Sequence, residues 1–268
     1  MDTTATMGRY HDELHVVTGV RDRVSAEEWQ TRTDLAACYR LVWHYGWHHL
    51  HLNHISARVP GTDDHYLLNP FGLLYNEVTA SNLVKVDLDG TILDDTPYTI
   101  NEAGYTIHSA IHAARHDVQC VLHTHTEAGM AVSALNCGLL PLNQGALRFY
   151  NRIGYHDYEG IALDLDERAR YAASLGPHKA LILRNHGLLT AGQSIAEAFT
   201  LMYHLEKSCA AQIAIGATTT DSNAFTFPPP EVCEHAAQQA NRNGRDHGAP
   251  SWPGLVRMMD RIDPSFRD

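Results

Sequence analysis

Short runs of alternating or continuous apolar residues recur along the first two thirds of the chain and predict β-strands. These runs are residues 55–59, 66–68, 83–88, 91–93, 120–122 and 179–183. Turn residues at 60–64 and at Asp89-Gly90 connect the first two pairs of runs, which predicts two hairpins. Because a hairpin pairs its strands antiparallel, we expect a mainly antiparallel sheet.

Between and after these strands, apolar residues recur at helical spacing. The segments expected to be helical are 25–45, 104–116, 128–135, 166–175, 194–215 and 230–242. Ser25 with Glu28, and Ser194 with Glu197, have the spacing of capping boxes and mark where two helices begin. The chain beyond 242 is expected to be irregular. Since strands and helices alternate, we expect one α/β domain with helices on both faces of the sheet.

Composition and charge narrow the classes of partner. The chain of 268 residues is 44% hydrophobic and 19% charged, and its formal net charge is -11. This negative charge argues against nucleic acid or an anionic membrane as a partner. The five cysteines are scattered without a Cys-x-x-Cys pair, and no secretory signal pattern or long apolar run is present. We therefore expect a cytoplasmic protein with free thiols.

The candidate chemistry begins with a pair of histidines at the end of a predicted strand. His123 and His125 are two residues apart, so on a strand both rings would point to the same face. Two neutral imidazoles on one face can begin a metal site. The chain has 19 histidines, so a His-x-His pair arises by chance about once. A second pair, His49 and His51, is attributed to chance.

A third histidine makes the pair more informative. His186 follows the predicted strand 179–183, in a turn that also contains Gly187. The backbone freedom of that glycine is expected to let the turn approach a metal closely. Three protein ligands with open coordination positions are typical of a catalytic metal site.

Other histidines are interpreted as structural. His54 lies in the first predicted strand. His108 and His112 are one helical turn apart on the apolar helix 104–116. That spacing can bind metal, but the pattern favours hydrogen-bonded side chains.

Several longer segments carry a resemblance to a known protein family. They are residues 53–59, 68–75, 78–86, 103–111, the pair His123 and His125, 155–160 and 183–188. They occur in order across residues 35–215, about two thirds of the chain. With these segments the sequence resembles the class II aldolase/adducin family, and most closely its adducin-head-like bacterial branch.

The resemblance implies a three-layer α/β/α fold and a homo-oligomer, often a tetramer. It also implies a divalent ion, Zn²⁺ or Fe²⁺, held by His123, His125 and His186. In the aldolases this ion polarises the oxygens of a small carbonyl substrate. The implied domain plan is an N-terminal arm at 1–24, a class II aldolase/adducin-like domain at 25–220, and a C-terminal extension at 221–268 that packs on it.

The departures from the family pattern concern the acid/base and the phosphate site. Family aldolases carry a glutamate at the position of Gly104, and two serines that bind phosphate at the positions of Glu102 and Ala103. A carboxylate in place of a hydroxyl repels phosphate by more than about 1 kcal/mol in a partly buried site. Sugar phosphates are therefore disfavoured, and Glu102 becomes the candidate catalytic acid/base.

The remaining candidates are substrate-binding residues. Asn53, Asn69 and Gly72 lie in segments that surround the substrate in the family, and they are expected to hold a carboxylate or a hydroxyl.

Three functions remain open. The first is a metal-dependent lyase, a decarboxylase or retro-aldol enzyme acting on an unphosphorylated 2-oxo or 2-hydroxy acid. The second is a non-haem Fe(II) oxygenase that performs oxidative decarboxylation of an aryl-pyruvate, as in some members similar to this branch in aminocoumarin antibiotic pathways. The third is a non-catalytic adducin-like interaction domain.

Overall fold

The centre of the structure is a seven-stranded sheet with the strand order β3-β2-β1-β4-β7-β6-β5. The computed structural model describes residues 14, 17–161, 165–219, 221–244 and 246–268, without the side chains of 102, 103, 165, 222 and 243. The strands are β1 (His54–Arg58), β2 (His65–Leu68), β3 (Val84–Asp87), β4 (Cys120–Thr124), β5 (Gly154–His156), β6 (Ala180–Leu183) and β7 (Gly187–Gly192). All neighbours pair antiparallel except β5 with β6, so the predicted sheet is confirmed.

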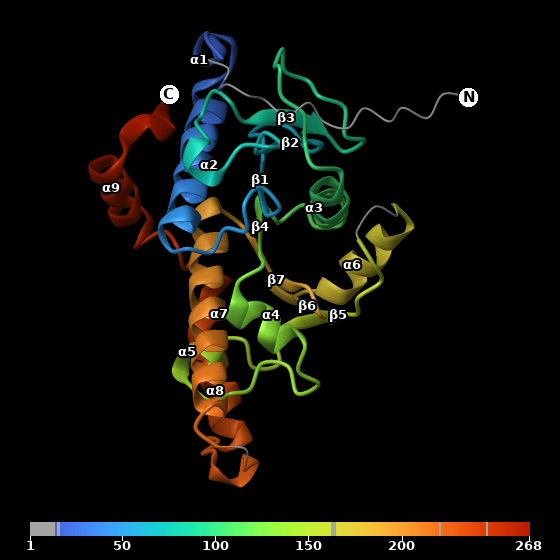
Figure 1. The fold of residues 1–268 in the computed structure, drawn as a ribbon, viewed down its shortest axis with the longest axis vertical. Helices are drawn as coiled ribbons and strands as arrows, with labels where there is room; N and C mark the ends of the chain where they lie inside the picture. Colours follow the sequence, from blue (N-terminus) through green and yellow to red (C-terminus); the bar gives the residue numbers. More distant parts are fainter. Residues whose placement is uncertain (1–13, 15–16, 162–164, 220, 245) are drawn as a thin grey trace.

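Helices cover both faces of this sheet (Figure 1). One layer contains α2 (Ala26–His44) and α7 (Ile195–Gly216), and the other contains α3 (Glu102–Ala114) and α6 (Arg168–Leu175). A separate hydrophobic core lies on each face of the sheet, and adjacent residues of β4 point into different cores. Leu122 packs in the core with α2 and α7, and Val121 packs in the core with α3 and α6. The predicted three-layer α/β/α architecture is therefore confirmed.

Shorter helical segments complete the chain. They are α1 (Val20–Arg23), α4 (Glu127–Ser133), α5 (Gln144–Leu147), α8 (Pro230–Ala240) and α9 (Trp252–Ile262), with 3-10 turns at Tyr75–Glu77, Leu165–Glu167, Ser222–Ala224, Arg242–Gly244 and Pro264–Arg267. Among the described residues, no helix is both long and apolar enough to cross a membrane.

Only the hydroxyl half of each predicted capping box fits the structure. Ser25 Oγ accepts from Glu28 N at 3.1 Å, which caps α2. The Glu28 carboxylate, however, pairs with Arg32 and Lys85, each at 3.0 Å. Burial explains the difference, because the Arg32 side chain is 0% exposed and needs a counter-charge.

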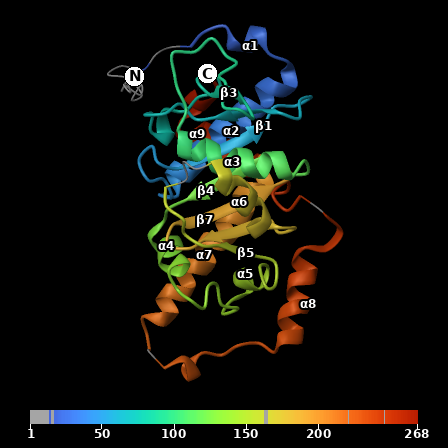
Figure 2. The same cartoon turned by 90° about the vertical axis from the view of Figure 1, so that its right-hand side faces the viewer.

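The prediction of an irregular C-terminus is wrong. After α7 the chain crosses below the sheet and returns along α8 (Figure 2), and α9 then packs on α2. Trp252 Nε1 donates to Asp34 Oδ1 at 2.9 Å, and Phe266 is 0% exposed. Pro253 lies in the first turn of α9, where its missing N–H would have no helical partner in any case. This proline therefore marks the start of a helix. The boundaries 1–24, 25–220 and 221–268 stay predictions.

Candidate metal centre

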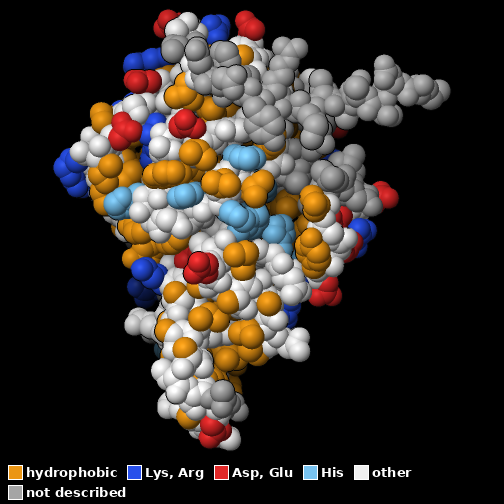
Figure 3. All heavy atoms as spheres, viewed as in Figure 1, with side chains coloured by type: hydrophobic (Ala, Val, Ile, Leu, Met, Phe, Trp, Pro, Cys, Tyr) orange, Lys and Arg blue, Asp and Glu red, His pale blue; other side chains and the backbone are white. Residues whose placement is uncertain are grey.

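The three predicted histidines meet at one end of the sheet. His123 is on β4, His125 follows that strand directly, and His186 is at the tip of the β6–β7 hairpin. The Nε2 atom of His123 lies 2.6 Å from that of His125 and 3.2 Å from that of His186. Each ring offers a ligand atom, and all three atoms lie within 4.8 Å of one another. Histidine side chains also gather at the middle of the face in Figure 3.

A backbone carbonyl orients the first ring of this triad. His123 Nδ1 lies 2.8 Å from Leu188 O, and a carbonyl oxygen only accepts hydrogen bonds. The ring proton is therefore on Nδ1, and Nε2 keeps its lone pair. This is the outer-shell arrangement that orients a metal-binding histidine.

Burial keeps the triad neutral. Desolvation lowers the pKa of His123 well below its usual range, with His125 and His186 adding to the effect. Desolvation also lowers the pKa of His125 to about 3 and lowers the pKa of His186, against an opposing effect of Glu167. Neutral imidazole is the form that binds a metal, so the donor set fits a divalent ion. That it holds one stays a prediction.

Two threonines and a buried glutamate fix the chain around His125. Thr124 Oγ1 donates to Glu206 Oε1 at 2.5 Å, and Thr126 Oγ1 donates to Glu206 Oε2 at 2.6 Å. Thr126 also caps α4 by accepting from Gly129 N. Glu206 could not be predicted from the sequence, because its helix begins about 70 residues after His125 and no local pattern links the two.

The hairpin of His186 uses its glycine differently from the expectation. The left-handed backbone belongs to Asn185, at φ 55°, a residue type that tolerates this conformation. Gly187 is required by space, since a Cβ atom there would lie 2.2 Å from Thr124 O. The glycine therefore lets β7 approach β4 and the backbone beside His125.

The second His-x-His pair lies next to the triad. His49 Nδ1 is 3.3 Å from His125 Nδ1, and the ring of His51 meets that of Phe71 edge-on at 5.2 Å. His49 therefore contacts a candidate ligand, although the sequence pattern alone gave it no role.

The predicted substrate-binding residues differ in their surroundings. Asn53 is 0% exposed, and neither polar atom of its side chain has a hydrogen-bond partner among the described residues. Asn69 Oδ1 accepts from Tyr39 OH at 2.9 Å, and Tyr39 OH also accepts from Ile55 N at 2.9 Å. Tyr39, which the sequence analysis did not single out, thus pins the start of β1 to the end of β2. Gly72 has φ 92° with open space beside it. Substrate binding by these residues stays a prediction.

The predicted acid/base, Glu102, is the first residue of α3. Its side chain lies outside the described part of the chain, so its role stays a prediction.

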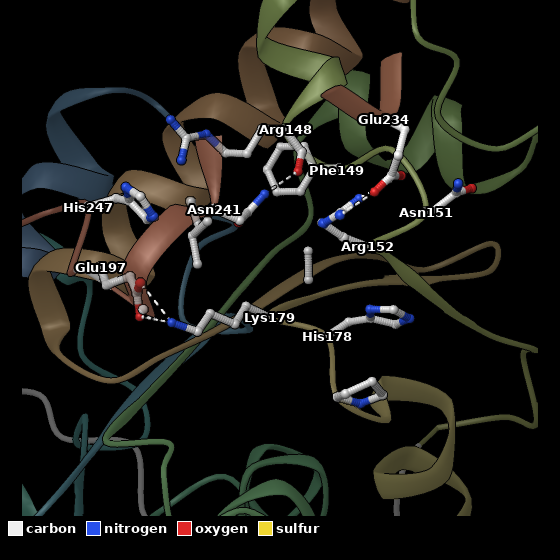
Figure 4. A pocket seen from close by; sticks show the side chains of 14 residues that line it. Arg148, Phe149, Asn151, Arg152, His178, Lys179, Glu197, Glu234, Asn241 and His247 are labelled. Carbon is white, nitrogen blue, oxygen red and sulfur yellow. Dashed lines mark hydrogen bonds and ion pairs between the residues drawn. The ribbon is translucent and has the colours of Figure 1, made fainter. Parts of the chain in front are cut away.

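A cavity of about 490 Å³ lies apart from the histidine triad, between α8 and the start of β6 (Figure 4). Four of its charged side chains form two ion pairs: Lys179 with Glu197 at 2.7 Å, and Arg152 with Glu234 at 2.6 Å. None of the triad residues lines it. The pair of Arg152 with Glu234 fits a role in holding α8 to the domain.

Comparison with known proteins agrees with this fold. Residues 33–213 match the family described as Class II Aldolase and Adducin N-terminal domain. A putative aldolase class 2 protein of Pseudomonas aeruginosa is 50% identical over 253 residues, which cover 92% of this chain and 96% of that protein.

Two further relatives extend the comparison to adducins and to a solved aldolase. Alpha-adducin of Rattus norvegicus is 42% identical over 243 residues, which cover 86% of this chain and 33% of the adducin. The solved L-fuculose 1-phosphate aldolase of Glaciozyma antarctica superposes with a TM-score of 0.80 and 27% identity, covering 96% of this chain and 97% of that one. The chain therefore belongs to the class II aldolase and adducin family.

Proposed function

We propose that the protein is a divalent-metal-dependent lyase that cleaves a carbon–carbon bond in an unphosphorylated 2-oxo or 2-hydroxy acid. The observation that carries the proposal is the convergence of three neutral imidazoles on one point. Similarity to a solved aldolase over nearly the whole chain supports the reaction class.

The chain's own residues would hold the ion and orient it. His123, His125 and His186 would each offer Nε2, because Nδ1 of His123 faces a carbonyl and Nδ1 of His125 faces His49. When bound, Zn²⁺ or Fe²⁺ supplies Lewis-acid chemistry at a substrate carbonyl. His123 is buried and would shield the ion from water on its side, while the half-buried His125 and His186 leave an approach for the substrate. Glu206 would hold the backbone on both sides of His125.

Charge favours an acid as the substrate. Three neutral ligands leave the full charge of a divalent ion for substrate oxygens, since Gly104 brings no carboxylate. The amide of Asn53, which has no partner in the described part of the chain, is a further group that a carboxylate or hydroxyl could satisfy. Glu102 and Ala103, in place of phosphate-binding serines, disfavour a phosphorylated substrate.

We also propose a cytoplasmic homotetramer that acts on a small molecule and uses neither nucleic acid nor a membrane as a partner. The net charge of -11 supports the last two points.

Metal analysis combined with an oxygen electrode tests the proposal. The purified protein is reconstituted with zinc or iron and assayed against a panel of 2-oxo and 2-hydroxy acids, with and without oxygen. Anaerobic cleavage by the zinc or iron form supports the lyase. Substrate-dependent oxygen uptake by the iron form alone would replace it with an Fe(II) oxygenase. No metal retained after reconstitution would overturn both and favour an adducin-like interaction domain.

A further inference from the structure

A histidine fills the space beside Gly104. An ideal Cβ atom at Gly104 would lie 2.5 Å from Cδ2 and 2.9 Å from Nε2 of His54, far inside van der Waals contact. His54 is the direct neighbour of His123 across the β1–β4 ladder, and their ring centroids are 5.2 Å apart. The side chain missing at position 104 is therefore replaced in space by an imidazole next to the triad.

Behind His54 runs a buried chain of hydrogen bonds. His54 Nδ1 lies 2.9 Å from His108 Nε2. His108 Nδ1 lies 2.6 Å from Ser56 Oγ, which lies 2.8 Å from His112 Nε2. None of the four side chains is more than 4% exposed. The chain joins β1 to α3 through three rings and one hydroxyl.

These contacts allow two orders of protons. In the first, Ser56 donates to His112 Nε2 and accepts from His108 Nδ1. His108 Nε2 accepts from His54 Nδ1, which leaves a lone pair on His54 Nε2. In the second, every hydrogen bond is reversed, and His54 Nε2 carries a proton. Each ring is neutral in both orders. A proton taken up at His54 Nε2 can shift along the chain and convert the first order into the second. The added charge then lies on His112, because His112 Nδ1 has no hydrogen-bond partner among the described residues to which it could release a proton.

From this geometry we infer that His54 exchanges a proton with the substrate and that His108, Ser56 and His112 are positioning residues that act through it. The inference rests on the proposed lyase function. It adds a proton-transferring group that the sequence analysis had assigned a structural role.

The step balances within the site. As the carbon–carbon bond of a retro-aldol substrate breaks, its electron pair passes into an enolate, and the O–H pair of the substrate hydroxyl forms the new carbonyl. His54 Nε2 takes the hydroxyl proton. The same proton then passes from Nε2 to the enolate carbon, so no further reactant is needed.

The chain of hydrogen bonds matters while His54 holds the extra proton, because it can move the positive charge away from the ion. A cationic ring next to a divalent ion would be repelled. Three proton shifts move that charge to His112, which lies on α3 one helical turn beyond His108. Arg58 Nη2 donates to His112 O at 2.7 Å, so a cation already lies beside His112. Its repulsion favours rapid return of the proton to His54.

The test uses the full-length, zinc-loaded protein and pyruvate as the probe. Exchange of the methyl protons of pyruvate into D₂O, followed by NMR, reports proton transfer at the carbon next to a carbonyl. Ser56→Ala is expected to slow this exchange at saturating pyruvate at least tenfold, with KM and zinc content unchanged. Ser56→Thr restores the hydroxyl and is expected to recover part of the rate.

The matched control is Ser109→Ala. Ser109 lies on α3, the helix of His108 and His112, and its hydroxyl donates to Thr106 O, outside the histidine chain. This substitution is expected to leave exchange within twofold of the original protein. In parallel, solid-state ¹⁵N NMR of histidine-labelled protein reads which ring nitrogens carry protons. Ser56→Ala should change the proton positions of His54 and His108, whereas Ser109→Ala should not.

The outcomes separate this inference from the proposed function. If the original protein exchanges pyruvate protons but Ser56→Ala matches it in both rate and ¹⁵N spectrum, the relay is wrong and the lyase stands. If the zinc form shows no exchange, the proposed chemistry fails with this probe, and the ¹⁵N spectra alone decide. An unchanged spectrum in Ser56→Ala then overturns the relay, and a changed one supports it.

Discussion

Thr124 donates a hydrogen bond of 2.5 Å to Glu206, across 82 positions of the chain. Glu206 also accepts from Thr126, so a single carboxylate holds the residues on both sides of His125. Burial raises the pKa of this carboxyl above its ordinary value of 4.5, while the two threonine hydroxyls oppose the shift. The backbone that carries a candidate metal ligand thus depends on a buried acid of α7.

The raised pKa of Glu206 predicts a pH-dependent difference in stability between the protein and its Glu206→Gln variant. A carboxyl whose pKa is higher in the folded protein contributes its full stability below the unfolded-state pKa of about 4.5. That contribution is lost as pH rises through the folded-state pKa. The glutamine does not titrate, so the advantage of the original protein should shrink above about pH 4.5, by about 1.4 kcal/mol per unit of pKa difference. Urea unfolding of both proteins at several pH values measures this. Parallel pH curves would contradict it.

Removing one ring of the triad is expected to abolish metal binding without unfolding the protein. His123→Ala deletes the ligand that Leu188 O orients, so stoichiometric zinc should be lost while the circular dichroism spectrum is kept. His49→Ala removes only a neighbour of His125 and should weaken zinc binding about 10- to 100-fold. The exposed His116 supplies the control, because His116→Ala should bind zinc normally. Full zinc content in His123→Ala would show that the ligand set is wrong.

What the sequence could predict depended on the distance over which residues act. His123 and His125 are two apart on a strand, so the period of the strand alone placed both rings on one face. His186 was a candidate from its place in a turn after a predicted strand, and the family resemblance then joined it to the pair, because a hairpin tip and a strand end have no local signal in common. His54 and Gly104 show the limit: the glycine was visible as a missing glutamate, but the ring that fills its space comes from another strand.

The same limit applies to the ends of helices. The Ser25 cap was readable from four consecutive residues, yet the partner of Glu28 was set by Arg32 and Lys85, which tertiary packing brings close. Likewise α9 was missed because its packing surface is α2, more than 200 residues earlier in the chain. Local patterns predicted where elements begin, and long-range burial decided what their side chains do.

The last residues of the chain are expected to be part of the folded domain. Phe266 is fully buried and packs in the same core as the helix α2, and Ala80 N donates to Phe266 O at 2.9 Å. Phe266→Ala should therefore lower the free energy of unfolding by about 3–5 kcal/mol. Phe227→Ala is the control, since Phe227 is 44% exposed and its loss should cost less than about 0.5 kcal/mol. Equal unfolding midpoints for the two variants would indicate a separate C-terminal unit.

The contact between His54 and Gly104 predicts a specific coupling between the two positions. Gly104→Ala places a Cβ atom 2.5 Å from the ring of His54 and should destabilise the protein by about 1–3 kcal/mol through overpacking. Gly216, also in a helix, has open space where its Cβ would be, so Gly216→Ala should be neutral or stabilising by up to about 1 kcal/mol.

A double-mutant cycle isolates this coupling. His54→Ala removes the obstructing ring, so the double variant Gly104→Ala/His54→Ala should be more stable than the sum of the single effects by about 1–3 kcal/mol. The free energies of unfolding of all four proteins give the coupling directly. In the background of His54→Ala, Gly104→Glu should also be tolerated better than in the original protein, because the position would again have room for a side chain. Strictly additive effects would mean that His54 moves aside at little cost, and the ring could then not be the fixed group that replaces the missing carboxylate.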